Sequence, residues 1–193
     1  MNKTKINYKN IYCPPGGILV WIIIFLELIT FSIALIAMVI SSKQNSIVFH
    51  ESRLLLNTAF GTINTIFLIT SGFFMAMSVN YLKEKNTKNS LLFLTLTMLG
   101  GILFLILKSV EYFDKIEAGL TIGYNTFFTF YWLLTLFHVI HVIVGLVILI
   151  SVYFGLKNEN STTSIEDIES SAAFWHMCDL IWLLLFPIIY LIF

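Results

Sequence analysis

Hydrophobic positions along the chain gather into five long runs, which short polar stretches separate. A helix needs about 20 mainly apolar residues to cross the hydrocarbon of a bilayer, and each run reaches that length. We therefore predict five membrane helices, over residues 18–41, 54–82, 89–110, 125–156 and 172–193. The expected fold class is an all-α, polytopic membrane helix bundle, with residues 1–193 forming a single membrane domain.

The polar stretches set the ends of these runs. Two prolines and two glycines at residues 14–17 stop any helix before the first run, and residues 83–88 form a short turn between the second and third. Lysines at positions 3, 5 and 9 precede the first run, as in a signal peptide. That run is too long for the apolar region of a signal peptide and contains Glu27, so we expect a retained first helix.

Composition agrees with this pattern and excludes several classes of protein. Hydrophobic residues make up 58% of the 193 residues and charged residues 11%, and the mean hydropathy is +0.90, which excludes an ordinary water-soluble domain. The net charge is zero and no long basic run occurs, so nothing supports nucleic-acid binding. Cys13 and Cys178 form no CxxC or CxxCH spacing, which argues against covalent haem and iron–sulfur clusters.

The distribution of lysine and arginine predicts the orientation in the membrane. The N-terminus, the 83–88 turn and the 157–171 connection together hold seven of these residues, and the opposite side holds four: Lys43, Arg53, Lys108 and Lys115. Positively charged loops stay in the cytoplasm. We expect a multi-pass protein of the bacterial inner membrane with a cytoplasmic N-terminus and an outside C-terminus.

Two imidazoles near the middle of the fourth run are the first candidates for chemistry. His138 and His141 share a helical face with Tyr131, Thr135 and Gly145, and this stripe predicts packing against another helix. Neutral imidazole also binds metals, but a closed site needs further ligands. Besides this pair, only His176, Asp179 and Glu27 are at hand in the spans. Interhelical hydrogen bonding is the favoured interpretation, with metal or haem binding as the alternative.

Two carboxyl groups lie inside predicted helices. Glu27 follows the start of the first helix by nine residues, which places it roughly 13 Å deep at 1.5 Å per residue. We expect it to be uncharged there and to donate a hydrogen bond to a neighbouring helix, with a proton relay as the alternative. His176 and Asp179 stand one turn apart near the cytoplasmic end of the fifth helix, and we expect them to pair as the strongest polar anchor in the bundle.

Two further patterns favour a structural interpretation. In the second helix a ridge of small and polar residues recurs at helical spacing, which predicts close packing, with a substrate path as the alternative: Asn57, Gly61, Asn64 or Thr65, Ser71 or Gly72, and Met75. After the third run, Glu111, Asp114 and Glu117 alternate with Lys108 and Lys115. This charged pattern is typical of a helix end that emerges into water.

Several motifs in register resemble subunit III of haem-copper respiratory oxidases, the cytochrome c oxidase subunit III family. The most specific are FHVIHVIVG at 137–145 and FWHMCDLIWLLLFPIIYLIF at 174–193. In the same order come IFLEL around Glu27, LNTAFGTINTIFLITSGFF at 56–74, KSVEYFDKIEAG from 108, and NTFFTFYWLLT ending at 135. The resemblance runs from Gly16 to the C-terminus.

Departures from the family pattern point to one of its branches. Larger members have seven helices, and the first helix here resembles their third, with their intramembrane glutamate at Glu27. The five-helix branch associated with nitric oxide reductase is the most similar, ahead of the quinol oxidases. The lipid cleft of the seven-helix members cannot be assumed, because their first two helices are missing.

The resemblance implies a non-catalytic subunit without haem, copper or another cofactor. Its implied partners are the catalytic haem-copper subunit, which it stabilises and whose proton or oxygen access it supports, and membrane lipids. Residues matching the family's buried polar positions are Glu27, Glu111, His138, His141, His176 and Asp179, and we expect these and Asn57 to form buried contacts to other helices, lipids or the partner. No catalytic residue or metal ligand is expected in this chain.

Three other functions remain open from the residues themselves. An independent redox enzyme needs a metal centre, which the three intramembrane histidines do not convincingly build. A small transporter is suggested by Glu27 and the polar ridge, but repeats and glycine- or proline-broken helices are missing. The third alternative is an assembly factor without an oxidase partner. The sequence does not decide whether a partner complex reduces oxygen or nitric oxide, or whether its donor is quinol or cytochrome c.

Overall fold

The computed structural model describes residues 17–158 and 164–193. The predictions made for the lysine-rich start, for Cys13 and for the helix stop at 14–16 lie outside the described residues. In the described part the chain forms α1 (Ile18–Gln44), α2 (Ser46–Leu54), α3 (Thr58–Lys83), α4 (Thr87–Glu117), α5 (Thr126–Lys157) and α6 (Ile165–Pro187), followed by the π-helical turn η1 (Ile188–Ile192). Five of these segments are long and apolar enough to cross a membrane, which confirms the predicted all-α polytopic bundle.

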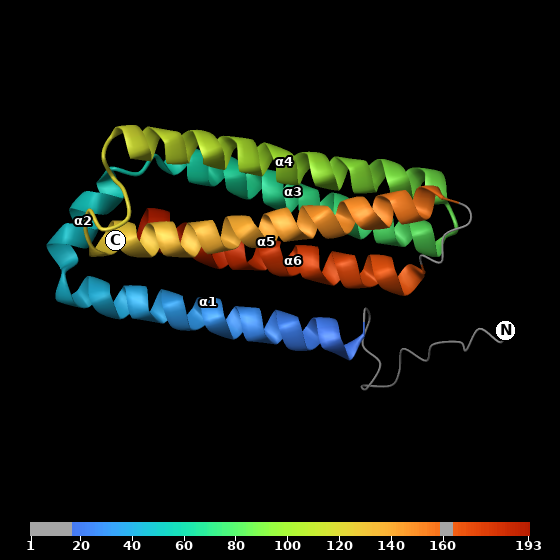
Figure 1. Cartoon of the computed structure of the whole chain (residues 1–193), viewed down its shortest axis with the longest axis horizontal. Helices are drawn as coiled ribbons and strands as arrows, with labels where there is room; N and C mark the ends of the chain where they lie inside the picture. The colour runs from blue at the N-terminus through green and yellow to red at the C-terminus, as the bar shows by residue number, and fades with distance from the viewer. Residues whose placement is uncertain (1–16, 159–163) are drawn as a thin grey trace.

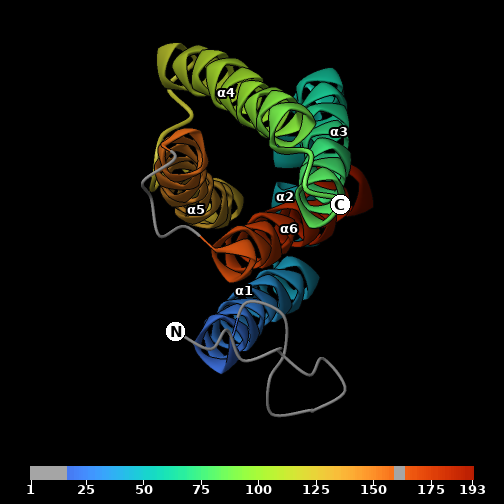
Figure 2. The same cartoon turned by 90° about the vertical axis from the view of Figure 1, so that its right-hand side faces the viewer.

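Successive long helices run in opposite directions, roughly along one common axis (Figure 1). The α3–α4 turn lies at the same end of the bundle as the start of α1, whereas α2, the α4–α5 connection and the C-terminus lie at the other end. The count of lysine and arginine on the two sides of the membrane assumed this same grouping of the connections. Viewed from the end, α6 lies between α1 and α3, with α5 beside it and α4 across the bundle (Figure 2).

Some helix boundaries differ from the prediction. α4 continues to Glu117 instead of ending at residue 110, and α6 begins at Ile165 instead of 172. The early start of α6 has a local cause, because Ser164 and Asp167 form a capping box that satisfies free backbone N–H groups of the first turn. Short α2 was not predicted, and it buries Phe49 and Ser52 against the end of the bundle.

Small residues bring α6 close to its neighbours. Gly101 of α4 and Gly145 of α5 form a notch for the Trp175 ring, since a Cβ on either would lie 2.6 Å or 2.9 Å from that ring. The indole Nε1 of Trp175 donates to Ser71 Oγ of α3 (3.0 Å), and Ser71 Oγ donates to the Thr97 carbonyl of α4 (2.8 Å). Trp175 of α6 therefore packs against α3, α4 and α5.

Peripheral α1 is the least enclosed of the spans. It packs on α6 and α5 through Ile24, Phe31, Leu35 and Met38, while its other apolar side chains face outward, with Leu19 70% and Ile33 63% exposed. Such a surface is stable only in hydrocarbon or against another protein. The protein is therefore a multi-pass membrane protein.

Candidate functional site

A cluster of four polar side chains lies buried between α4, α5 and the end of the chain. Lys108 and Glu111 are each 1% exposed and form an ion pair, with Nζ 2.9 Å from Oε2. Two phenols complete the cluster: Tyr131 donates to Glu111 Oε1 at 3.0 Å, and Tyr190 donates to the same oxygen at 2.6 Å. Lys108 Nζ in turn donates to Tyr190 at 2.8 Å and to Tyr131 at 3.3 Å. We call these four residues the Lys108 cluster.

Aromatic rings lie around the Lys108 ammonium, and two other basic side chains bind backbone carbonyls nearby. The ammonium lies 5.1 Å from the ring centre of Tyr112 and 5.3 Å from that of Trp182, distances at which ring faces stabilise a cation. Nearby, Arg53 Nε donates to the Tyr190 carbonyl at 3.2 Å, and Lys115 Nζ donates to the Leu55 carbonyl at 2.6 Å. These contacts connect the end of α2 to α4 and to η1.

The Lys108 cluster corrects one prediction. Asp114 and Glu117 are exposed, as expected for a helix end in water, but Lys108 and Glu111 are enclosed and Lys115 is largely buried. Charges at i, i+3 spacing look the same on a solvated helix end and in a buried pair. The phenols of α5 and η1 distinguish the two situations. Tyr190 lies 79 positions from Glu111, so the spacing of charges along α4 does not reveal this partner.

The histidine stripe of α5 is buried, but its two imidazoles differ. His138 is fully enclosed between Phe104 (5.6 Å between ring centres) and Trp182 (5.3 Å), and among the described residues neither ring nitrogen has a hydrogen-bond partner. The favoured interpretation of His138 as an interhelical hydrogen-bonding residue is therefore wrong in this structure, and aromatic packing takes its place. Asn64 of α3 is also fully buried, and its side-chain atoms have no partner in the described part of the chain.

His141 and Glu27 form the polar contact between α5 and α1. His141 Nδ1 lies 2.7 Å from the Phe137 carbonyl, which can only accept, so this nitrogen carries the proton. Its Nε2 lies 3.2 Å from Glu27 Oε2, although the two groups are not aligned as a hydrogen bond. An uncharged glutamic acid would suit this arrangement, since it can donate to the free lone pair of Nε2. The charge state of Glu27 stays a prediction.

His176 and Asp179 form a weaker pair than expected. The His176 Nδ1 lies 3.5 Å from Asp179 Oδ2, and the His176 side chain is 45% exposed. Asp179 is 8% exposed, its Oδ2 occupies the space that a Cβ at Gly72 would fill, and its Oδ1 has no hydrogen-bond partner among the described residues. The expectation that this pair is the strongest polar anchor is wrong, because the Lys108 cluster has that place.

The predicted ridge of α3 is buried from Gly61 onward, but Asn57 is not part of it. Asn57 is exposed, and its side chain caps α3 by accepting from the Ala59 N–H at 3.0 Å. The prediction that Asn57 is buried is therefore wrong, because residues 55–57 belong to the connection between α2 and α3. An asparagine three residues into a predicted helix is equally compatible with a shifted helix start.

Some residues of the site carried no clear signal in the sequence. Tyr190 sits in an apolar run near the C-terminus, and only its phenol among isoleucines and leucines hinted at a buried partner. At the other end of the bundle, Lys83 Nζ lies 2.7 Å from Glu169 Oε1 and forms an ion pair between α3 and α6. Both residues were predicted to lie in connections between helices. Within the described part of the chain, no three histidine, cysteine, aspartate or glutamate side chains gather as metal ligands.

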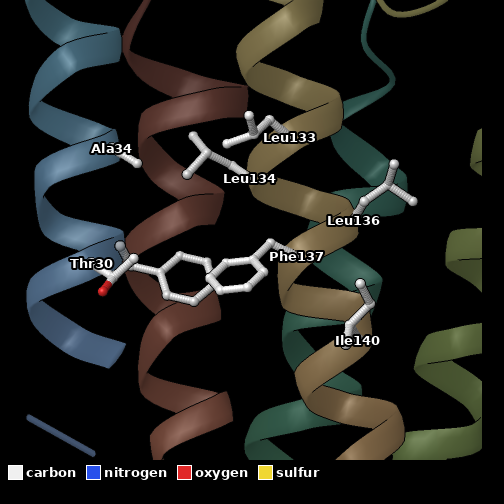
Figure 3. A pocket seen from close by; sticks show the side chains of 8 residues that line it. Thr30, Ala34, Leu133, Leu134, Leu136, Phe137 and Ile140 are labelled. Carbon is white, nitrogen blue, oxygen red and sulfur yellow. The ribbon is translucent and has the colours of Figure 1, made fainter. Parts of the chain in front are cut away.

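A groove between α1 and α5 opens on both sides of the Glu27–His141 contact. One hollow of about 410 Å³ is lined by Thr30, Phe31 and Ala34 of α1 and by Leu133, Leu134, Leu136, Phe137 and Ile140 of α5 (Figure 3). A second hollow, of about 350 Å³, is lined by Val20 and Ile23 of α1, by Val144 and Ile148 of α5, and by residues at the start of α6. Both hollows are almost wholly apolar.

Fold and site together define a class: an integral membrane bundle in which a buried lysine–glutamate pair of one helix binds phenols from two other helical segments. The family model described as cytochrome c oxidase subunit III matches residues 54–192, which include α3–α6 and the whole Lys108 cluster. The chain belongs to the cytochrome c oxidase subunit III family. The earlier resemblance is thereby confirmed at the level of the family.

Individual relatives show how far the similarity extends. The chain is 27% identical over 172 residues to cytochrome bo(3) ubiquinol oxidase subunit 3 of Buchnera aphidicola, which covers 89% of this chain and 83% of the relative. It is 35% identical over 132 residues to the probable cytochrome c oxidase subunit 3 of Rickettsia conorii, covering 67% and 46%. For the cytochrome c oxidase subunit 3 of Synechocystis the identity is 33% over 132 residues, covering 67% and 55%. The chain thus spans about half the length of these two relatives.

Proposed function

We propose that this chain is the non-catalytic third subunit of a respiratory haem-copper oxidase complex. In this role it contacts the catalytic haem-copper subunit in the membrane, stabilises it and supports electron-transport-linked reduction of oxygen or nitric oxide. Membership of the family supports the proposal, as do the relatives named as subunits of ubiquinol and cytochrome c oxidases.

The observation that carries the proposal is the closure of the Lys108 cluster. Both oxygens of Glu111 and the Lys108 ammonium are engaged by partners within the chain. A catalytic acid, base or ligand must have an atom free for its substrate. A fully engaged network instead fixes the positions of helices, which is the property required of a scaffold beside a catalytic subunit.

The catalytic partner subunit, and not this chain, determines which electron donor and acceptor the complex uses. The relatives carry both ubiquinol oxidase and cytochrome c oxidase names, so each class of donor occurs in the family. Because the sequence motifs resemble the branch associated with nitric oxide reductase, we propose nitric oxide as the second acceptor to be assayed beside oxygen. The N-terminus is proposed to face the cytoplasm of a bacterial inner membrane, in line with the distribution of lysine and arginine.

Lipids are proposed as a second class of partner. The two hollows between α1 and α5 have apolar walls and open toward the outer surface of the bundle, as an acyl chain requires. They occur without the two additional helices of the larger family members. Lipid analysis of the gently purified protein tests this part: retained phospholipid that survives delipidating washes supports it, and its complete loss without change in stability contradicts it.

Purification under mild detergent tests the main proposal. A tagged chain should bring a haem-containing subunit with it, seen as a Soret band, and the preparation should reduce oxygen or nitric oxide when given quinol or reduced cytochrome c. Deletion of the gene should lower the amount or the stability of that activity in membranes. If no haem-containing subunit accompanies the chain and deletion leaves both activities unchanged, the proposal is wrong.

A further inference from the structure

A polar pair lies on the edge of the groove between α1 and α5, halfway along a membrane-spanning helix. His141 is 15 residues from the start of α5 and 16 from its end, so roughly 23 Å of helix extends to either side of it. Glu27 of α1 is its partner, 3.2 Å away. The side chains of His141 and Glu27 are 11% and 19% exposed, so the pair reaches the surface of the groove. Lipid headgroups lie about 15 Å from the bilayer centre and cannot solvate this pair.

The pair has hydrogen-bonding capacity that the chain does not use. His141 Nδ1 donates to the Phe137 carbonyl, which leaves the lone pair of Nε2 as an acceptor. Glu27 Oε2 faces Nε2 but forms no hydrogen bond with any described residue. Unpaired polar groups are costly at this depth, because neither water nor a headgroup is at hand to bind them. An imidazole lone pair and a carboxyl group are therefore available to a ligand that enters the groove.

Two aromatic rings connect the polar pair to the larger hollow of the groove. Phe31 of α1 and Phe137 of α5 both line the hollow of about 410 Å³, and they stack with ring centres 5.0 Å apart. Both rings also contact the imidazole of His141, at 5.6 Å and 4.6 Å between ring centres. Phe137 extends across the groove toward α1 (Figure 3). The polar pair and the apolar hollow are therefore parts of one site.

We propose that this site binds a prenylated quinone or its quinol, with the ring beside the Glu27–His141 pair and the prenyl tail in the larger hollow. A quinol hydroxyl donates to His141 Nε2, and the Glu27 carboxyl group bonds to the same head group. Phe31 and Phe137 offer aromatic faces and edges to the flat ring. The inference concerns binding alone, without an electron-transfer step, and it goes beyond the proposed function.

The depth of the polar pair favours a quinone over a phospholipid as the occupant. A phospholipid keeps its polar atoms near the membrane surface, so its acyl chains would fill the hollows and leave the pair without a partner. A prenylated quinone carries a few polar atoms on an otherwise apolar molecule and enters the hydrocarbon as a whole. Such a ligand matches an apolar pocket with a small number of placed polar groups. The smaller hollow, on the other side of the pair, stays available to an acyl chain.

Binding of decylubiquinone and decylubiquinol to the purified full chain tests the proposal. The chain is placed in nanodiscs of synthetic phosphatidylcholine, its melting temperature is checked, and saturable binding is measured by calorimetry. Ala34→Phe fills the larger hollow and should abolish binding, whereas Ala37→Phe, on the outward face of the same helix, should leave it unchanged. Glu27→Leu should weaken binding about threefold to tenfold, the ratio that one hydrogen bond provides. Equal affinity of all four chains, or no saturable binding to the wild type, would overturn the proposal.

A photoreactive quinone decides the question even if a variant does not fold. An azido derivative of decylubiquinone is irradiated with the wild-type chain, and mass spectrometry locates the label. Label within residues 27–34 and 133–141 that excess decylubiquinone suppresses and 1-decanol does not suppress supports the site. Label confined to other surfaces, or equal suppression by 1-decanol, overturns it. The measurement needs no second subunit, so failure to recover a haem-containing partner contradicts the proposed function and leaves this result unaffected.

Discussion

At the scale of single residues, the Lys108 cluster shows how a membrane protein accommodates two full charges. Burying a lysine or a glutamate alone in the bundle would cost several kcal/mol. Each here receives an opposite charge at 2.9 Å and two phenols, and ring faces lie above the ammonium. The cost of removing one partner is therefore larger than the net benefit of the whole cluster.

Charge removal at Lys108 should reveal this imbalance. Lys108→Met leaves Glu111 without its cation, and we expect a loss of about 3–5 kcal/mol in unfolding free energy. The double variant Lys108→Met/Glu111→Gln should recover part of that loss because no net charge stays buried. Thermal unfolding in detergent measures both, with exposed Lys88→Met as the control. A double variant that is less stable than Lys108→Met would contradict the argument.

Glu27 should tolerate an uncharged substitute. Glu27→Gln keeps the size of the side chain and can donate to His141 Nε2, the atom 3.2 Å from the carboxyl group. Glu27→Lys instead places a cation in the contact between α1 and α5, where it replaces the carboxyl group and is costly to keep charged at membrane depth. Expression and monodispersity on size-exclusion chromatography should therefore stay near wild type for the first variant and fall for the second. Equal loss with both would show that the carboxylate charge itself is needed.

Which residues are buried was easier to predict than what they contact. Periodicity placed His138, His141 and Thr135 on a packed face, and all three are buried. The same periodicity did not show that His138 is enclosed by Phe104 and Trp182, or that Glu111 meets Tyr190, because those partners come from other helices. Contacts between helices depend on rotation and depth, which a single helical stripe does not specify.

At the scale of the elements, α6 organises the bundle. It lies between α1 and α3, its Trp175 enters the notch between Gly101 and Gly145, and Trp182 Nε1 donates to Thr65 Oγ1 of α3 at 2.9 Å. The hydrophobic pattern predicted the existence of α6 and the other spans. It misplaced the start of α6 by seven residues because the polar segment 165–171 is helical through its cap and through the contact of Glu169 with Lys83.

Filling the notch should weaken α6 packing. Gly101→Ala places a methyl group 2.6 Å from the Trp175 ring, so the ring or the helix must shift, at a cost of about 1–3 kcal/mol. Ala76→Leu, which enlarges an exposed side chain of α3, serves as the control. Tryptophan fluorescence should shift and the melting temperature should fall for Gly101→Ala alone. An unchanged melting temperature would mean that the notch has more room than the structure shows.

At the scale of the whole molecule, an odd number of spans puts the ends of the described chain on opposite sides of the bundle. The α3–α4 turn lies at the end where α1 begins, and the α4–α5 connection lies at the other (Figure 1). The structure gives these positions. The prediction of which end faces the cytoplasm depends on the count of seven basic residues against four.

Cysteine labelling checks the orientation. Single cysteines replace Lys85 or Asp114, both exposed, in a background without Cys13 and Cys178. In intact cells an impermeant thiol reagent should label position 114 and leave position 85 unlabelled until the membrane is opened. Labelling of both positions in sealed cells would contradict the predicted topology, and labelling of position 85 alone would reverse it.

The central claim is that this chain stabilises a haem-copper subunit without taking part in its chemistry. Separating the purified complex into its subunits tests that claim most directly. We predict that the Soret band and the turnover with oxygen or nitric oxide stay with the catalytic fraction, and that adding the colourless chain back raises that fraction's melting temperature. A haem band or turnover in the fraction containing this chain alone, or a melting temperature that does not respond to it, would contradict the account.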